Sequence, residues 1–326
     1  MSFLIDFTKS KSNNKLYGGN AGLKKGVIYN NKNYLIKFPQ ETSNFQNVEI
    51  SFTTSPLSQY IGSHIYQILG YEAHNTILGF FYNEKISRKQ VVVACEDFTN
   101  NGKFKLIDYE SIKNNYSDEL QALLITLNEN LPNYKSSGLS QHSIKIEEII
   151  LQFQENEIFK QNSQIIDLFW DMLVIDCIIN NNDRNKNNWG LLYDLENETY
   201  LLAPVYDNGA SFVSKHTDEK LLRIMSTEEK MKNSVLNGMC YYTIDNELLN
   251  FKKFFIKLEE KSLDTNFKIA VDRVLNKFRE KWEEIQEFIN KIPREDQSLI
   301  VITDVQKEFF IKSMKIRLNQ IFDANI

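Results

Sequence analysis

The loop Asn181-Asn-Asp-Arg-Asn-Lys-Asn-Asn-Trp189 carries a carboxylate and a carboxamide at a spacing that could support chemistry. Asp183 and Asn188 are separated by four residues, which is the spacing of the proton acceptor and the metal-binding amide in loops that catalyse phosphoryl transfer. The Asp183 carboxylate could accept a hydroxyl proton, and the Asn188 amide oxygen could bind Mg²⁺. In a chain this rich in Asn, the pair alone could also be accidental.

A second carboxylate follows a predicted hairpin. Trp189–Tyr193 and Thr199–Val205 are β-rich runs joined by a polar turn, a pattern typical of a β-hairpin. The hairpin returns the chain to Asp207, which would then stand beside Asn188 as a second oxygen ligand for Mg²⁺. Taken alone, the sequence Asp-Asn-Gly at this point is also that of a type I′ turn.

A glycine-rich stretch near the N-terminus could bind the phosphates of a nucleotide. Gly18, Gly19 and Gly22 lie close together before Gly26, and their backbone N–H groups could approach an anion without Cβ clashes. The stretch matches neither a Walker A loop nor a strict GxGxxG pattern. A flexible surface turn is the alternative interpretation.

Lys37 follows this stretch in the predicted strand Tyr34–Phe38. Strand alternation places Lys37 and Leu35 on one face and the other three residues of the strand on the opposite face. A lysine on a covered strand face needs an anionic partner, and kinases use a strand lysine after a glycine loop to hold the nucleotide phosphates. A solvent-facing lysine on an edge strand is the alternative.

Two further parts of a nucleotide site stay open at this stage. The acidic partner of Lys37 is either Glu49 or absent, since the nearby predicted helix offers only Gln59 at its start. The backbone of Glu96 and Phe98, at the end of a predicted buried strand, could hydrogen-bond an adenine base. Any strand that connects two domains would look the same.

The elements that must position these residues fall into two groups. Residues 1–97 are predicted as a small β-rich, nucleotide-binding lobe, and residues 98–326 as a larger, mainly helical catalytic lobe, which makes the fold class α+β. The expected strands of the first lobe are Val27–Tyr29, Tyr34–Phe38, Thr76–Tyr82 and Val91–Cys95, with one helix at Ser58–Leu69. The expected helices of the second lobe are 117–129, 144–160, 163–180, 246–261, 265–290 and 303–322. A cleft between two lobes is a common place for a ligand.

Composition narrows the class of protein further. The 326 residues carry a net charge of −5, which argues against a general nucleic-acid binder. Cys95, Cys177 and Cys240 lie far apart in or beside apolar runs, so buried, reduced thiols are expected rather than disulfides or a zinc site. No secretory signal is recognisable, and the most apolar segment, Ile165–Ile179, is too short and too acidic to span a bilayer. A cytoplasmic location is therefore the default expectation.

Most of the chain resembles the HipA-type serine/threonine kinases, and in particular the short, stand-alone cell-translocating form of that family. The stretches that carry the resemblance are Gly18–Lys25, YLIKFP around Lys37, SQYIGSHIYQILG (58–70), VVVACEDF (91–98), NNDRNKNNWG (181–190) and LLAPVYDNG (201–209). The resemblance implies a protein-kinase-like bilobal fold, Mg-ATP as phosphate donor, and Ser/Thr acceptors with frequent autophosphorylation. By the same match, Lys37 would hold the phosphates, Asp183 would be the catalytic Asp, and Asn188 and Asp207 would bind the metal.

Two positions depart from the family pattern. Asn185 stands where the family has His after Asp-Arg, and Gln59 stands where relatives often have Glu. Asp-Arg-x-x-x-Asn followed by Asp-x-Gly also resembles lipid kinases. A lipid or small-molecule kinase and an inactive, ATP-binding scaffold therefore remain as alternatives to a protein kinase.

The resemblance adds expectations about partners and location. It implies a protein substrate that bears Ser or Thr, which could be the chain itself or a host-cell protein. It also suggests a role in virulence, with secretion or delivery into a host cell. The missing signal sequence, in contrast, favours the cytoplasm. Nucleic acid and a membrane span are not expected.

Overall fold

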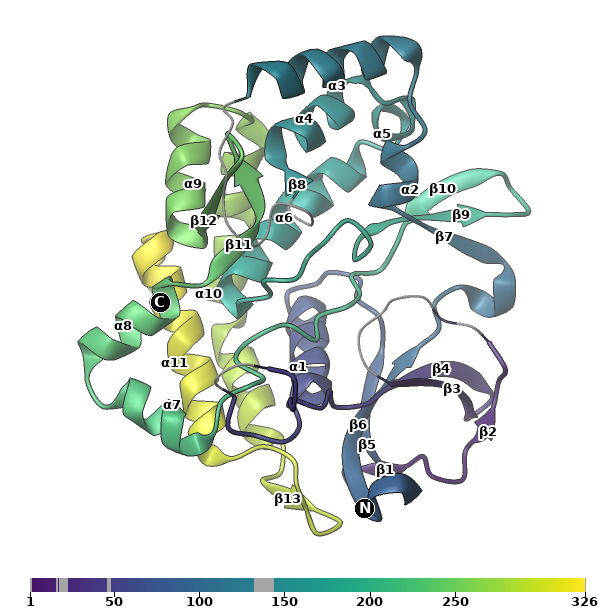
Figure 1. Cartoon of the computed structure of the whole chain (residues 1–326), viewed down its shortest axis with the longest axis vertical. Helices are drawn as coiled ribbons and strands as arrows, with labels where there is room; N and C mark the ends of the chain where they lie inside the picture. The colour runs from purple at the N-terminus through teal and green to yellow at the C-terminus, as the bar shows by residue number, and fades with distance from the viewer. Residues whose placement is uncertain (1, 16, 18–22, 46–47, 132–143, 326) are drawn as a thin grey trace.

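The chain folds into a smaller lobe built on a β-sheet and a larger lobe built mainly from helices (Figure 1). The computed structural model describes residues 2–15, 17, 23–45, 48–131 and 144–325. The predicted α+β, two-lobed architecture is confirmed. Gly18, Gly19 and Gly22 lie outside the described residues.

A six-stranded sheet forms the body of the smaller lobe. Its strands lie in the order β1-β5-β6-β4-β3-β2, with β1 parallel to β5 and the other pairs antiparallel. Their bounds are β1 Ile5–Asp6, β2 Lys11–Ser12, β3 Lys24–Tyr29, β4 Lys32–Lys37, β5 Thr76–Asn83 and β6 Arg88–Glu96, and helix α1 spans Ser55–Ile68. Tyr34, Ile36 and Phe38 are buried on one face of the sheet. The predicted alternation along β4 is therefore confirmed, and Lys37 points to the other face, toward the cleft.

Helices make up most of the larger lobe (Figure 1). Their bounds are α2 Tyr109–Lys113, α3 Asp118–Asn130, α4 Ile146–Glu155, α5 Glu157–Gln161, α6 Gln164–Ile179, α7 Asp218–Met225, α8 Glu228–Leu236, α9 Phe251–Glu260, α10 Thr265–Lys291 and α11 Asp304–Ile321. Short strands connect them: β7 Phe104–Asp108, β8 Ile144–Lys145, β9 Gly190–Asp194, β10 Thr199–Leu202, β11 Met239–Ile244, β12 Glu247–Asn250, β13 Glu295–Asp296 and β14 Leu299–Ile300. The predicted hairpin is confirmed as β9 and β10, and β9 also pairs with β7.

Helix α6 lies at the centre of the larger lobe, because its sequence is apolar on nearly every side. From Phe169 to Ile179 its residues are buried, and α10 and α11 pack against it. Such a helix belongs in the interior of a large domain. It therefore gives a rigid base to the loop that follows it.

Polar side chains divide two segments that the sequence analysis predicts as single helices. The 144–160 segment is broken at Asn156, which is extended and whose side chain accepts a hydrogen bond from Ile158 N at the start of α5. In the 246–261 segment, strand β12 occupies the first residues, and Asn250 then caps α9 by accepting from Lys253 N. Asn is a preferred N-cap residue, so each Asn begins a helix rather than continuing one.

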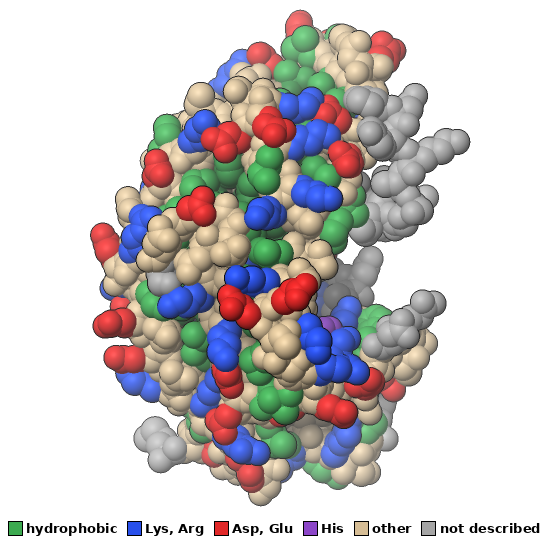
Figure 2. Space-filling model, turned by 90° about the vertical axis from the view of Figure 1, so that its left-hand side faces the viewer, with side chains coloured by type: hydrophobic (Ala, Val, Ile, Leu, Met, Phe, Trp, Pro, Cys, Tyr) green, Lys and Arg blue, Asp and Glu red, His purple; other side chains and the backbone are tan. Residues whose placement is uncertain are grey.

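The three cysteines are free and buried, as predicted. Among the described residues, no helix combines the length and the apolar character needed to cross a membrane. Basic and acidic side chains are interspersed on the face drawn in Figure 2, where a notch separates the upper from the lower part at the right-hand edge.

Candidate active site

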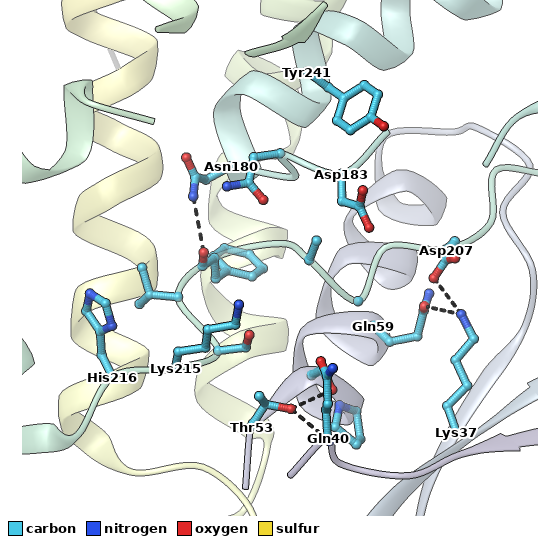
Figure 3. Close-up of a pocket in the computed structure, with 18 of the residues that line it drawn as sticks. Lys37, Gln40, Thr53, Gln59, Asn180, Asp183, Asp207, Lys215, His216 and Tyr241 are labelled. Atoms are coloured by element: carbon cyan, nitrogen blue, oxygen red, sulfur yellow. Dashed lines mark hydrogen bonds and ion pairs between the residues drawn. The ribbon is translucent and has the colours of Figure 1, made fainter. Parts of the chain in front are cut away.

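Two cavities meet in the cleft between the lobes. The larger one, about 880 Å³, lies on the side of Glu96 and Phe98, and the smaller one, about 650 Å³, lies on the side of Lys215 and His216 (Figure 3). The side chains that line both are Lys24, Lys37, Asp183, Asp207 and Tyr241. Asn188 lines the larger cavity. Residues predicted from separate parts of the sequence are thus brought to one place.

Lys37 makes two contacts at the floor of the cleft. Its Nζ donates to Asp207 Oδ1 at 2.6 Å and to Gln59 Oε1 at 3.2 Å (Figure 3). Burial lowers the pKa of Lys37, but the nearby negative charge of Asp207 outweighs this effect and raises it above the ordinary value. The lysine therefore carries its full positive charge.

Glu49, considered above as the partner of Lys37, does not occupy that position. Its carboxylate is exposed and accepts a hydrogen bond from Thr217 Oγ1 at 3.3 Å. Gln59 projects from the first turns of α1 into the cleft. The hydrogen bonds of Lys37 therefore go to a neutral amide and to Asp207, which is far away in the sequence. Gln59, noted above at the start of the predicted helix and as a departure from the family, is therefore a partner of Lys37.

The loop after α6 places Asp183. Helix α6 ends at Asn180, which adopts the left-handed conformation with φ of 57°, as Asn does more readily than most residues. Asn188 Nδ2 then donates to the backbone carbonyl of Asp183 at 2.7 Å, and Asn185 Nδ2 donates to Asp183 Oδ1 at 3.3 Å. Both ends of the predicted Asp183/Asn188 pair are therefore held in a single closed loop.

A buried ion pair anchors this loop to α6. Arg184 and Asp176 are each 1% exposed, and Arg184 Nε and Nη2 donate to the two oxygens of Asp176 at 2.7 and 3.0 Å. Arg184 Nη1 also donates to the carbonyls of Asn188 and Tyr206. One guanidinium thus links the helix, the Asp183 loop and the segment that carries Asp207.

The sequence contained a signal for this ion pair. Asp176 is the last of three aspartates in a mainly apolar helix, and a buried carboxylate requires a cationic partner. Arg184 is the first basic residue after it along the chain.

The segment after the hairpin pairs with the smaller lobe, and this pairing fixes the position of Asp207. Residue 205 forms an isolated bridge with residue 73, with His74 N donating to Val205 O at 3.1 Å and Val205 N donating to Glu72 O at 2.8 Å. Two residues later, Asp207 adopts a left-handed backbone with φ of 58°. The turn directs its carboxylate at Lys37.

Glycine allows α1 to approach this turn closely. A Cβ on Gly62 would lie 2.9 Å from Asn208 Cβ and 3.0 Å from Ser211 Oγ, which is tighter than a real side chain tolerates. Asn208 Nδ2 donates to Ser63 Oγ at 3.1 Å, and Arg184 Nη2 donates to Asn208 Oδ1 at 2.6 Å. Buried polar groups therefore join α1 to the Asp183 loop.

The pKa values of the two carboxylates in the cleft, Asp207 and Asp183, are shifted in opposite directions. Burial raises the pKa of Asp207, but the positive charge and hydrogen bond of Lys37 outweigh this and lower it to about 2. Burial and the negative charge of Asp207 raise the pKa of Asp183 above its ordinary value, against the hydrogen bond from Asn185 and the charges of Arg184 and Lys215. Asp183 is thus the more basic of the two.

The larger cavity has an apolar end beside the predicted adenine strand. Leu35, Cys95, Phe98 and Leu106 line it, and the ring of Phe98 lies 5.7 Å from that of Tyr206. The side chain of Glu96 instead accepts from Lys32 Nζ at 2.7 Å. The contact of the Glu96 backbone with an adenine base stays a prediction.

Lys24 is a cleft residue that the sequence analysis missed. It lies directly opposite Lys37 in the β3–β4 register and lines both cavities. Burial and the charge of Lys37 lower the pKa of Lys24, as expected for two cations that share one face. Lys24 and Lys37 are neighbours because of the strand register, which the sequence does not reveal.

The chain was compared with known proteins and solved structures. The serine/threonine-protein kinase CtkA of Helicobacter pylori is 28% identical over 324 residues, covering 98% of this chain and 87% of the relative. The crystal structure of the Helicobacter pylori proinflammatory kinase CtkA superimposes with a TM-score of 0.77 at 25% identity, covering 98% of this chain and 96% of that one. The chain is similar to CtkA from end to end. No family model matches it.

The likeness to CtkA confirms the predicted relationship and the protein-kinase-like bilobal fold. It also confirms the predicted class of enzyme, a phosphotransferase of the protein kinase type. A HipA structure from Shewanella oneidensis aligns with a TM-score of 0.48 at 12% identity over 95% of this chain.

Proposed function

We propose that the protein is an ATP-dependent serine/threonine protein kinase that uses Mg²⁺ and phosphorylates itself. The observation that carries this proposal is the Lys37–Asp207 pair, 2.6 Å apart, in a cleft that Asp183 also lines. Phosphoryl transfer needs a lysine and carboxylates in this relation and little other chemistry from the protein. The acceptor type, Ser or Thr, is taken from the likeness to CtkA.

The oxygen donors of the cleft fit a magnesium ion. Asp207 is ionised at neutral pH, since its pKa is about 2. Asn188 uses its Nδ2 to hold the Asp183 carbonyl, which leaves Oδ1 as its ligand atom. Mg²⁺ prefers one or two protein oxygens together with phosphate oxygens. When bound, the ion would neutralise charge on the phosphates.

The nucleotide would lie in the larger cavity. Its base would occupy the slot beside Phe98 and contact the backbone at Glu96, and its phosphates would extend toward Lys37. Gly18, Gly19 and Gly22, which lie outside the described residues, stay proposed phosphate-binding residues on the sequence alone. This arrangement would make residues 1–97 the nucleotide-binding lobe and residues 98–326 the catalytic lobe. The acceptor would enter from the smaller cavity.

Asp183 would act as the proton acceptor. The acceptor hydroxyl oxygen bonds to the γ-phosphorus, the bond from that phosphorus to the bridging oxygen breaks, and ADP leaves. The hydroxyl proton passes to the Asp183 carboxylate, whose raised pKa favours proton acceptance. Asn185, whose presence suggested an inactive scaffold, donates to that carboxylate and partly offsets the rise in its pKa.

The proposal is tested with γ-labelled ATP and Mg²⁺. The wild-type protein should incorporate label into itself and into a generic Ser/Thr protein substrate, and Asp207→Asn or EDTA should abolish both. Asp323→Asn, at an exposed position outside both cavities, is the matched control and should behave as wild type. Label that appears only in added lipids or small alcohols would contradict a protein acceptor, and ATP binding without any transfer would indicate a scaffold.

Lys24→Met should raise the KM for ATP about 10-fold with a smaller change in kcat, because one of two cations facing the phosphates is lost, at about 1.4 kcal/mol. Lys25→Met is the matched control: Lys25 follows Lys24 on β3, and its Nζ lies 4.7 Å from the Phe81 ring centroid. Steady-state kinetics at varied ATP would measure both variants. Equal effects of the two substitutions would contradict a role for Lys24 in nucleotide binding.

A further inference from the structure

Behind Lys37, Gln59 contacts two buried groups to which the proposed reaction assigns no role. Gln59 Oε1 accepts from Lys37 Nζ at 3.2 Å, whereas Gln59 Nε2 lies 2.9 Å from His74 Nε2 and 3.2 Å from Ser63 Oγ. Gln59 and His74 are 1% and 5% exposed, and Ser63 is fully buried. Water therefore competes little for these hydrogen bonds.

The donor capacity of Lys37 decides the orientation of the Gln59 amide. An ammonium group can only donate, so the oxygen of Gln59 must face Lys37 and its NH₂ group must face His74 and Ser63. His74 Nε2 must then accept a hydrogen bond, which requires a neutral ring with its proton on Nδ1. Burial and the charge of Lys37 lower the pKa of His74 to about 3, in agreement with a neutral ring.

A second series of hydrogen bonds connects Arg184 to Ser63 through Asn208. Arg184 can only donate, so Asn208 turns its oxygen to Arg184, at 2.6 Å, and its Nδ2 to Ser63 Oγ, at 3.1 Å. Ser63 thus accepts from both amides, which uses both acceptor positions of its oxygen. Ser63 Oγ therefore serves both Gln59 and Asn208, whereas in the described part of the chain the hydrogen bond at His74 Nε2 comes from Gln59.

We infer that His74 is a positioning residue that acts on Lys37 through Gln59. By accepting from Gln59 Nε2, it keeps the amide oxygen directed at the lysine, so that a glutamine can serve where a carboxylate was expected. A ring that presented an N–H to Gln59 would favour the reversed amide, which would turn an NH₂ group toward an ammonium. The effect on nucleotide binding rests on the proposed function, whereas the tautomer of His74 does not.

The tautomer can be measured in the wild-type protein. With ¹⁵N-labelled histidine, the His74 ring should show a protonated Nδ1 and an unprotonated Nε2 from about pH 5 to about pH 8, without titrating near the ordinary value of about 6.5. The resonance would be assigned by its absence from the spectrum of a His74→Gln variant. A ring protonated at Nε2 would overturn the inference, whether or not the protein transfers phosphate.

The coupling to Lys37 can be measured by substitution. His74→Leu and Gln59→Leu should each weaken ATP·Mg²⁺ binding about 10-fold, and the double variant should bind no more weakly than Gln59→Leu alone, since His74 acts through Gln59. His74→Gln, which offers an amide oxygen in place of Nε2, should restore most of the affinity.

A matched control separates this effect from general loss of packing. His64 lies on α1, as Gln59 does, stacks on Phe288 with ring centroids 4.9 Å apart, and lines neither cavity. His64→Leu should leave the affinity for ATP·Mg²⁺ unchanged. Additive losses in the double variant, or a His74→Gln protein as weak as His74→Leu, would overturn the inference.

Discussion

Replacing Asp183 with Asn is expected to lower phosphoryl transfer by about 10³-fold while leaving the affinity for ATP unchanged. The substitution keeps the size of the side chain and removes its ability to accept a proton, and general-base groups contribute about 10² to 10⁴ in rate. Asp183 lies between the cavities and does not contact Lys37 in the described hydrogen bonds. Nucleotide binding should therefore survive.

This result can be measured by single-turnover transfer together with nucleotide-dependent thermal stabilisation. The stabilisation follows mass action and reports ATP binding without any turnover. Asn185→Ala provides a graded comparison, because it removes the hydrogen bond to Asp183 Oδ1 and should cost less than the loss of the carboxylate. Asp183→Asn protein that transfers phosphate at the wild-type rate would contradict the proposed role.

Replacing Arg184 with Met is expected to reduce the free energy of unfolding by about 3–5 kcal/mol, since it leaves Asp176 as an unpaired buried charge. The same change also removes donors from the carbonyls of Asn188 and Tyr206. Urea unfolding followed by circular dichroism would measure the loss. A variant with wild-type stability would show that the ion pair is dispensable for folding.

Arg273 on α10 offers a matched control on the same central helix. It pairs with Asp171 of α6 at 2.7 Å but is 32% exposed, so that water can partly replace it. Arg273→Met should cost less than Arg184→Met. Removing both charges of the buried pair, with Asp176→Leu and Arg184→Met together, should restore part of the stability, because no buried charge is then left alone.

The sequence predicted several residues that meet in the cleft, but not the contacts that support them. Asp183 and Asn188 were found from a local spacing, and Lys37 from strand alternation, both of which can be read within one element. The contacts of Gln59 with His74, and of Ser63 with Asn208, join residues that are 15 and 145 positions apart. Such pairs depend on packing between elements, which periodicity does not report.

Register and capping account for the other differences. Lys24 faces Lys37 only because β3 and β4 pair in one register, and a shift by one residue would have turned it away. Asn156 and Asn250 begin new helices through side-chain caps in segments whose apolar residues suggested continuous helices. In a chain with so much Asn, these caps are not distinguishable from exposed helix positions by pattern alone.

The close contact between α1 and the Asp207 turn has a consequence for regulation. An outward movement of α1 would break the Ser63–Asn208 and Lys37–Gln59 hydrogen bonds. It would also separate Gly62 from Asn208, which pack closely together. Each buried polar group left without a partner costs about 1–3 kcal/mol. We therefore expect this helix to stay docked with or without nucleotide, so that control of the enzyme would have to act on access to the cleft rather than on its assembly.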